Sequence, residues 1–239
     1  RWAALRLHHL EAWVLEWARP GMYAGIPGRG ADDAWYETAM EVEVAQLTNT
    51  AVLGGAVGIW KCFDQVPQSN LYSILLAAGF PRGVLRAYMA FQESVEYRNS
   101  LAGGLGAPHR RPFGIPQGCP FSMMYIALIV LPLLNLLQQF DQFISRILAD
   151  DICLLGIGPE GYRSFLSAFD ATHQYLIDLG ARLAPKKSYL FSNVAETRHW
   201  LSTYIWPALN VAIPTVSHVR DLGTHLNLSR AAVGTTITD

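Results

Sequence analysis

The sequence predicts an α+β fold in which helices cover one face of an antiparallel sheet. Apolar, β-branched runs of strand length alternate with longer segments of helical period, and an acidic turn separates two of these runs, 143–149 and 151–157. The expected order along the chain is strand, helices, long helix, hairpin, helix and strand, which is typical of a sheet backed by helices. A chain of 239 residues with 51% hydrophobic content is long enough to bury a substantial core.

The N-terminal part is expected to be helical on either side of a glycine-rich loop. Residues 1–18 carry an apolar stripe that Pro20 and Gly21 bring to an end. Residues 31–47 resume helical spacing, with acidic residues near the start, where the helix dipole favours them. Residues 50–60 then predict a buried strand, whose small residues suggest the close approach of another backbone.

The central part predicts two helices, 69–80 and 81–92, followed by extended chain with turns over 94–118. No charged residue lies between Gly114 and Phe140, so this stretch predicts either a buried helix or a membrane span. Pro132, Asn135 and the lack of a second candidate span favour the buried helix.

The C-terminal part begins with the hairpin around the acidic turn. Residues 162–180 then predict an amphipathic helix that ends at Gly180, and 188–192 and 218–226 predict short strands.

The charge and cysteine content limit the kinds of site. The formal net charge is -1 and the pI is about 6.7, so any contact with nucleic acid depends on local basic patches. Cys62, Cys119 and Cys153 are far apart and give neither a zinc-site spacing nor a disulfide framework, which suits an intracellular setting in the nucleus or cytoplasm. The N-terminal stretch does not resemble a signal peptide, and the absence of an initial Met leads us to expect a fragment.

Two adjacent carboxylates, Asp150 and Asp151, stand inside the apolar run RILADDICLLG. A Mg²⁺ ion at the tip of a hairpin would offset their mutual repulsion, because this cation prefers oxygen ligands. An exposed turn between two strands explains the same dipeptide, because Asp is common in turns.

Several motifs decide between these interpretations. Residues 148–151 (LADD) resemble the Tyr-x-Asp-Asp motif of reverse transcriptases, and GIPQGCPFS at 114–122 is similar to that family's Gly-x-x-Gln-Gly-x-x-x-Ser motif. The segment VGIWKCFDQVP at 57–67 resembles the strand motif that reads Asp-x-x-Lys-Ala-Phe-Asp-x-Val-Pro in non-LTR retroelements. Weaker resemblances are GIPGRGADDA at 25–34 (a fingers segment), LGARLAPKKSYLF at 179–191 (Pro-x-Lys-Thr) and VRDLGTHL at 219–226 (the Tyr-Leu-Gly hairpin).

The resemblance implies the fingers and palm of a right-hand polymerase, with the thumb largely absent. It implies a reverse transcriptase domain over 1–226, with a fingers-like part at 1–50, a palm with inserted fingers helices at 51–226, and an unassigned tail at 227–239. It further implies an RNA template, a DNA primer, dNTPs, Mg²⁺ or Mn²⁺ ions and the remainder of a parent polyprotein, without a membrane. Two metal ions held by carboxylates would promote attack of the primer 3′-hydroxyl on the α-phosphate of the dNTP.

The resemblance also assigns roles to single residues. Asp150 matches the family's metal-binding Asp, and Asp151 its neighbour with a lesser share. Gln117 and Gly118 match the residues beside template and nucleotide, and Phe63 matches the bulky residue that excludes a 2′-hydroxyl. Lys187 matches the lysine near the leaving pyrophosphate, although Lys186 and Lys187 also fit a solvated turn.

Three loop arginines, Arg98, Arg110 and Arg111, are candidates for phosphate contacts or for plain surface positions. Four tryptophans, Trp2, Trp13, Trp17 and Trp35, are expected to pack in the core and not to stack on bases.

One departure from the family concerns the reaction itself. The family's first catalytic Asp lies six residues before Asp64, and that position here is Gly58. Asp64 is a poor substitute, because an extended chain would place it about 20 Å away. We therefore expect a severe loss of polymerase rate, and an alternative function is a catalytically dead palm module that retains nucleic-acid binding or an assembly role.

Overall fold

The computed structural model describes residues 1–221 and 224–228. Its centre is a five-stranded sheet in the order β4-β5-β1-β6-β7. The strands are β1 (Val52–Val57), β4 (Phe143–Leu148), β5 (Asp151–Ile157), β6 (Tyr189–Ser192) and β7 (Thr215–Val216). All neighbouring pairs are antiparallel except β6 and β7, which run parallel. The expected α+β fold with an antiparallel sheet and helices is confirmed, and the parallel edge strand is an addition.

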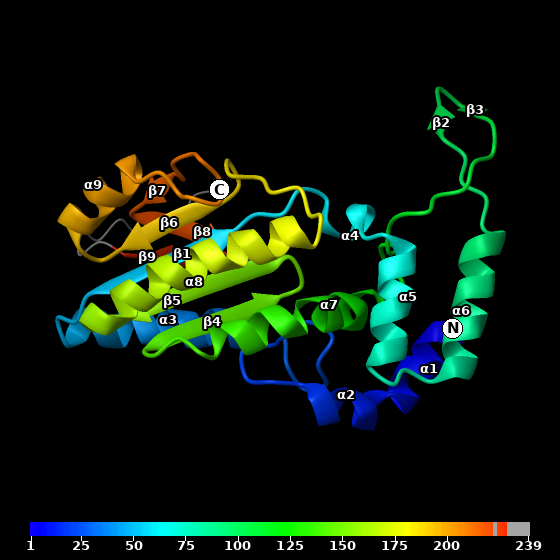
Figure 1. Ribbon diagram of the computed structural model, residues 1–239, viewed down its shortest axis with the longest axis horizontal. Helices are drawn as coiled ribbons and strands as arrows, with labels where there is room; N and C mark the ends of the chain where they lie inside the picture. Colours follow the sequence, from blue (N-terminus) through cyan, green and yellow to red (C-terminus); the bar gives the residue numbers. More distant parts are fainter. Residues whose placement is uncertain (222–223, 229–239) are drawn as a thin grey trace.

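Helices cover both faces of this sheet, and not one face as the sequence suggested (Figure 1). On one face α8 (Gly158–Asp178) packs Phe165 and Phe169 in the main core with Leu154 and Leu190. On the other face α3 (Ala31–Leu47) packs Val42 and Ala45 in a second cluster with Leu155 and Phe191. The two faces follow from strand alternation, because successive residues of β5 and β6 point to opposite sides.

The charge-free segment forms α7 (Ser122–Leu137), and eleven of its sixteen residues are buried, from Ser122 to Leu137. Its Pro132 lies inside the helix. The prediction of a buried helix is confirmed. Among the described residues, no helix combines the length and apolar character needed to cross a membrane.

The remaining helices lie around α7 and at the ends of the sheet (Figure 1). They are α1 (Trp2–His9), α2 (Glu11–Trp17), α4 (Cys62–Gln65), α5 (Gln68–Ala77), α6 (Arg82–Ser94) and α9 (Ala195–Thr203). The expected single helix over 1–18 is thus divided at Leu10, where ψ is -4°. The expected helices 69–80 and 81–92 correspond to α5 and α6.

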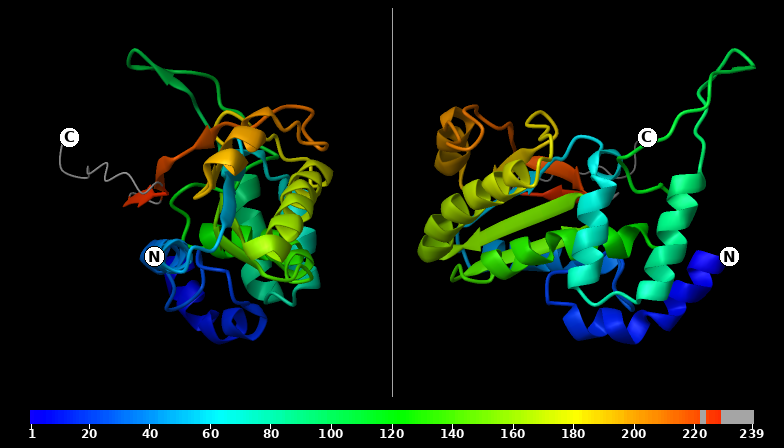
Figure 2. Two further views of the ribbon diagram at one scale, coloured as in Figure 1. Left: turned by 90° about the vertical axis from the view of Figure 1, so that its left-hand side faces the viewer. Right: turned by 45° about the vertical axis from the view of Figure 1, so that its right-hand side comes forward.

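A hairpin of two short strands, β2 (Ser100–Leu101) and β3 (Gly104–Leu105), projects away from the body of the molecule (Figure 2). Leu101 of β2 and Leu105 of β3 are largely exposed. Near the C-terminus, β8 (His218–Asp221) and β9 (Thr224–Asn227) form a separate two-stranded sheet. Of the strand expected over 218–226, residues 222–223 lie outside the described part, as does most of the tail 227–239. The division of the chain at residue 50 stays a prediction.

Candidate active site

The two acidic residues lie at the tip of the hairpin formed by β4 and β5. Leu148 pairs with Asp151, so the loop consists of Ala149 and Asp150 alone. Ala149 is buried and has φ 57°, a left-handed conformation that costs a non-glycine residue about 1–2 kcal/mol. Asp150 is half-buried and Asp151 is exposed. The expected turn is confirmed, and its strained backbone is the kind that surrounding structure must hold in place.

Three other motif segments meet at the same end of the sheet. The amide of Ile115 donates to the carbonyl of Phe63 at 2.8 Å, and that of Gly114 donates to Val66 at 2.8 Å, which joins segment 112–117 to segment 57–67. The amide of Ala184 donates to the carbonyl of Gly58 at 2.9 Å, which joins segment 182–188 to the same strand end. Residues far apart in the sequence therefore form one local site.

The charge of Asp150 acts on Cys62, which belongs to segment 57–67. Burial raises the pKa of the Cys62 thiol to about 12, and the negative charge of Asp150 adds to the increase. The loop after β1 and the acidic turn therefore lie within electrostatic reach of each other.

Gly58 follows β1 directly beside the acidic turn. Val57 pairs with Ile152, and continuing this antiparallel register by one residue places Gly58 next to Asp151. A Cβ atom on Gly58 would lie 2.8 Å from the Cβ of Lys187, 3.0 Å from its carbonyl carbon and 3.2 Å from the carbonyl oxygen of Ala184. The place of a side chain here is thus filled by the segment 184–187, and any larger residue requires this segment to move.

The carboxylates at the turn fit a cation only in part. Oxygen ligands of this kind suit one Mg²⁺ ion, which would be held by Asp150 and Asp151. A pair of bridged ions needs a further carboxylate, and Gly58 supplies none. Within the described ranges, no group of three or more His, Cys, Asp or Glu side chains is arranged to hold a metal ion. The donor set present here therefore does not fit a two-metal site.

Asp64 is not on an extended strand, which corrects the expected separation. The strand ends at Val57, and Asp64 lies on the short helix α4, which follows Lys61 in a left-handed conformation with φ 46°. The chain turns here because the backbone after Gly58 bonds to the segment 182–184 and no longer continues the sheet.

The other residues singled out by the sequence lie around this junction. Gln117 and Gly118 are exposed, and a Cβ on Gly118 would meet nothing within 4 Å, so the backbone there is open to close approach. Phe63 packs partly buried against the main core. Lys187 is exposed beside Gly58. Their roles toward template, nucleotide and pyrophosphate stay predictions.

An open groove lies at this junction. Part of its lining comes from the chain after β1 and from segment 182–188, with Trp60, Lys61, Asp64, Gln65 and Arg182. The rest comes from residues 110–117 together with Tyr97. Arg110, Arg111 and Gln117 thus share one groove, whereas Arg98 lies just before β2, with its Nη2 3.9 Å from Oε2 of Glu96.

Trp60 and Arg182 are groove residues that sequence reasoning missed. The guanidinium carbon of Arg182 lies 4.7 Å from the centre of the Trp60 ring, and Lys61 Nζ lies 5.0 Å from it. The available signal was an aromatic residue beside the lysine of a recognised motif. Trp2, expected in the core, is 44% exposed.

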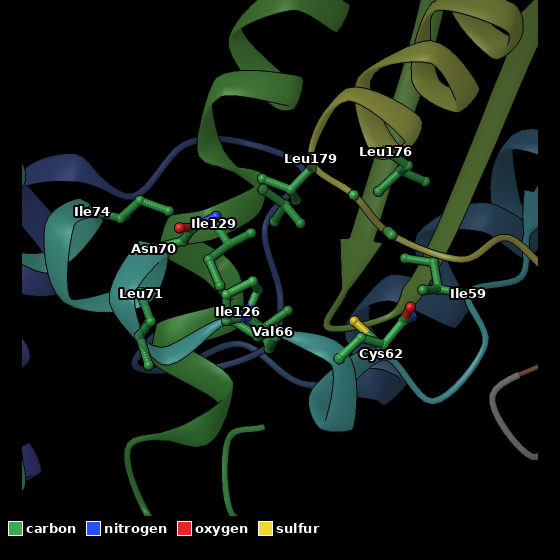
Figure 3. Close-up of a pocket in the computed structure, with 15 residues that line it drawn as sticks. Ile59, Cys62, Val66, Asn70, Leu71, Ile74, Ile126, Ile129, Leu176 and Leu179 are labelled. Carbon is green, nitrogen blue, oxygen red and sulfur yellow. The ribbon is translucent and has the colours of Figure 1, made fainter. Parts of the chain in front are cut away.

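A second cavity lies between α5, α7 and the end of α8 (Figure 3). Apolar side chains such as Leu71, Ile126, Ile129 and Leu176 line most of it, and Cys62 lies at its edge. Among the residues that the structure describes, no charged side chain lines this cavity.

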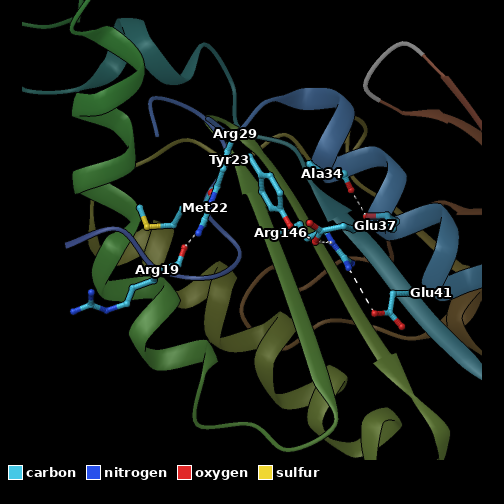
Figure 4. A network of polar contacts seen from close by, with 9 residues as sticks. Arg19, Met22, Tyr23, Arg29, Ala34, Glu37, Glu41 and Arg146 are labelled. Carbon is cyan, nitrogen blue, oxygen red and sulfur yellow. Dashed lines mark hydrogen bonds and ion pairs between the residues drawn. The ribbon is translucent and has the colours of Figure 1, made fainter. Parts of the chain in front are cut away.

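A buried arginine joins the hairpin of β4 and β5 to α3 (Figure 4). Arg146 of β4 lies with Nε 3.4 Å from Glu37 and Nη2 3.8 Å from Glu41, and its side chain is 6% exposed. Glu37 also accepts a hydrogen bond from the hydroxyl of Tyr23, whose pKa is raised by burial and by this bond. Arg29 donates to the carbonyls of Arg19 and Met22, which fixes the loop that pairs with Ile147 of β4.

The fold and the motif junction define a palm-type polymerase domain, and comparisons with known proteins agree. Residues 9–225 match the family model described as reverse transcriptase (RNA-dependent DNA polymerase). The chain belongs to the reverse transcriptase family. A search of curated proteins finds no significant match.

Solved telomerase structures are similar in fold. The telomerase of Candida albicans, in complex with a TWJ fragment of telomeric RNA, shares 15% identity over 94% of this chain with a TM-score of 0.58. The corresponding complex from Candida tropicalis shares 10% identity over 88% of the chain with a TM-score of 0.58. The truncated apo telomerase of Candida tropicalis shares 11% identity over 80% of the chain with a TM-score of 0.56. The chain spans only 36% to 40% of the length of these three proteins.

Proposed function

We propose that this chain is a reverse transcriptase domain that holds an RNA template and a DNA primer but adds dNTPs very slowly. The observation that carries the proposal is Gly58: the position beside the acidic turn has no carboxylate, and the segment 184–187 occupies the space of one. Loss of one oxyanion-hole donor lowers the rate of an enzyme about 10²–10³-fold. By analogy, we expect the missing carboxylate at position 58 to lower the rate of dNTP addition about a hundredfold or more.

The residues present would share the remaining tasks. Asp150 and Asp151 would hold one Mg²⁺ or Mn²⁺ ion, which supplies Lewis-acid activation of the reacting phosphate when bound. Gln117 and Gly118 would lie against template and nucleotide, because both are exposed beside the groove. Phe63 would exclude the 2′-hydroxyl and Lys187 would neutralise the leaving group. These assignments are supported by the meeting of their segments at one end of the sheet.

The order of the motifs supports an origin in a non-LTR retrotransposon, in which the chain would be one part of an intracellular polyprotein. Sequencing of the source locus beyond both ends tests this origin. An open reading frame that continues into other retroelement domains supports it, and flanks encoding a telomerase contradict it.

Primer extension on an RNA template, with Mg²⁺ or Mn²⁺, tests the proposed activity. The chain itself is expected to extend the primer no faster than its Asp150→Asn variant. Gly58→Asp alone is expected to fold poorly, because the new side chain meets Lys187 and the backbone of Ala184. The double variant Gly58→Asp with Lys187→Gly removes the closest contact, that with the Lys187 Cβ, and leaves the two backbone contacts to be relieved by a small shift of segment 184–187. We expect it to extend faster than Lys187→Gly alone.

Circular dichroism and thermal melting would show that the compared variants fold. Rapid extension by the unmodified chain, abolished by Asp150→Asn, would show that Gly58 does not limit the reaction. A folded double variant that extends no faster than Lys187→Gly would contradict the role given to Gly58.

A further inference from the structure

Trp60 and Arg182 form a fixed pair in the lining of the open groove. We propose that this pair is a stacking unit for one base of a single-stranded nucleic acid, whose phosphates are held by neighbouring cations. The inference rests on the proposed function, since it names what the groove of this domain binds.

The backbone holds both residues in place. The amide of Trp60 donates to the carbonyl of Arg182 at 2.9 Å. The side chain of Gln65 spans the pair: its Oε1 accepts from the amide of Arg182 at 2.8 Å, and its Nε2 donates to the carbonyl of Trp60. The backbone of both residues is therefore fixed before any ligand arrives, which lowers the entropy lost on binding.

Both members of the pair are accessible to a ligand. Trp60 is 40% exposed and Arg182 is exposed, and Lys61 Nζ lies 5.0 Å from the centre of the Trp60 ring. Flat surfaces of this kind, an indole and a guanidinium plane, are those on which unpaired bases stack. The accessible part of the pair therefore offers a base a flat surface beside positive charge.

The charges of the groove agree with a polyanion. Among the described residues, four cations line it, Lys61, Arg110, Arg111 and Arg182, against one acid, Asp64. The chain as a whole has a net charge of -1, so this is a local concentration of positive charge. Phosphate contacts from such a group supply most of the affinity of nucleic-acid binding.

A strand fits this groove better than a free nucleotide. The lining of the groove includes a second aromatic and cation pair, in which the guanidinium carbon of Arg111 lies 4.8 Å from the centre of the Tyr97 ring. Two such pairs in one groove offer places for more than one base and more than one phosphate. Repeated stacking along a charged groove is typical of single-strand binding.

Fluorescence anisotropy with a short fluorescein-labelled oligouridylate tests the proposal. The full chain is titrated at low ionic strength without Mg²⁺ or dNTP, so the result does not depend on nucleotidyl transfer or on Gly58. Trp60→Ala is expected to weaken binding about tenfold, and Trp60→Phe much less, because a base stacked on an aromatic ring is worth about 1–3 kcal/mol. Arg182→Gln is expected to weaken binding and to reduce the slope of log affinity against log salt by about one.

Trp200→Ala and Arg163→Gln are the matched controls, since Trp200 is 44% exposed on α9 and Arg163 is exposed on α8, both outside the groove. Both are expected to bind like the unmodified chain. The proposal is overturned if Trp60→Ala binds as tightly as Trp200→Ala, if the unmodified chain does not bind at all, or if a mononucleotide competes as well as the oligonucleotide. If the chain binds through Trp60 but extends primers rapidly, the proposal of slow dNTP addition is contradicted and the proposal of base stacking is not.

Discussion

Nε of Arg146 in β4 and Oε2 of Glu37 in α3 lie 3.4 Å apart. The two residues are 109 positions apart in the sequence, so the contact joins the N-terminal part of the chain to the strand that leads into Asp150. Arg146 is almost fully buried, and its Nη1 has no hydrogen-bond partner among the described residues. The arginine therefore depends on Glu37 and Glu41 for compensation of its charge.

Removal of Glu37 is expected to destabilise the protein. Glu37→Ala takes away a partner of Arg146 and the acceptor of the Tyr23 hydroxyl, so we expect a loss of about 2 kcal/mol in the free energy of unfolding. Urea denaturation measures this loss. Glu43→Ala, an exposed carboxylate on the same helix, is the control and should change little. Equal effects of the two substitutions would show that the contact with Arg146 contributes nothing.

The reactivity of Cys62 reports on the position of Asp150. Burial first and the charge of Asp150 second raise the thiol pKa to about 12, so little thiolate exists at neutral pH. In a Cys119→Ser, Cys153→Ser background, Asp150→Asn is expected to lower this pKa and to speed alkylation by iodoacetamide severalfold. Asp64→Asn, a nearby acid on α4, is the control. If Asp150→Asn leaves the rate of Cys62 alkylation unchanged at matched pH, the charge of Asp150 does not act on the Cys62 thiol.

Removal of the hydroxyl group is expected to have opposite effects on stability at two tyrosines. Tyr125 in α7 is fully buried, and its hydroxyl has no hydrogen-bond partner among the described residues, whereas the Tyr175 hydroxyl donates to the carbonyl of Ile129 at 2.7 Å. We expect Tyr125→Phe to raise the free energy of unfolding by about 1 kcal/mol and Tyr175→Phe to lower it by about 1 kcal/mol. Thermal and urea unfolding measure both changes. A loss of stability in Tyr125→Phe would reveal a partner of its hydroxyl.

The buried His173 is expected to make the free energy of unfolding depend on pH. The ring is fully buried in α8, and Nδ1 donates to the carbonyl of Phe169 at 2.7 Å. Burial lowers its pKa below the ordinary value of 6.5. Below pH 6.5 the unfolded chain therefore binds a proton that the folded chain does not, so stability falls as pH decreases toward the folded pKa.

The slope is expected to reach at most about 1.4 kcal/mol per pH unit, and it disappears above pH 6.5. Urea unfolding at several pH values, compared between the unmodified chain and His173→Leu, isolates this contribution from that of the carboxylates. His199→Gln, an exposed histidine on α9, serves as control. An identical fall in stability in His173→Leu would refute the prediction.

Local pattern predicted much of this fold correctly. The helix expected over 31–47 has the observed bounds of α3, and the apolar runs around Asp150 form the expected hairpin. These elements depend on neighbours in sequence: helical spacing, acidic residues in the first turn of α3, and a short turn between two β-branched runs. By contrast, α9 and the parallel strand β7 were not expected, because polar segments such as 195–203 carry no clear period.

The motifs of the sequence by themselves determined the family, the acidic turn and the lack of a carboxylate at Gly58. Only the tertiary structure decided that α3 covers the second face, because that depends on Val42 and Ala45 meeting Leu155 and Phe191. Only the tertiary structure showed that Lys187 and Ala184 fill the space beside Gly58, and that Gln65 joins Trp60 to Arg182. The physical reason is the same in each case: these contacts join residues distant in the chain, and a periodic pattern contains no information about them.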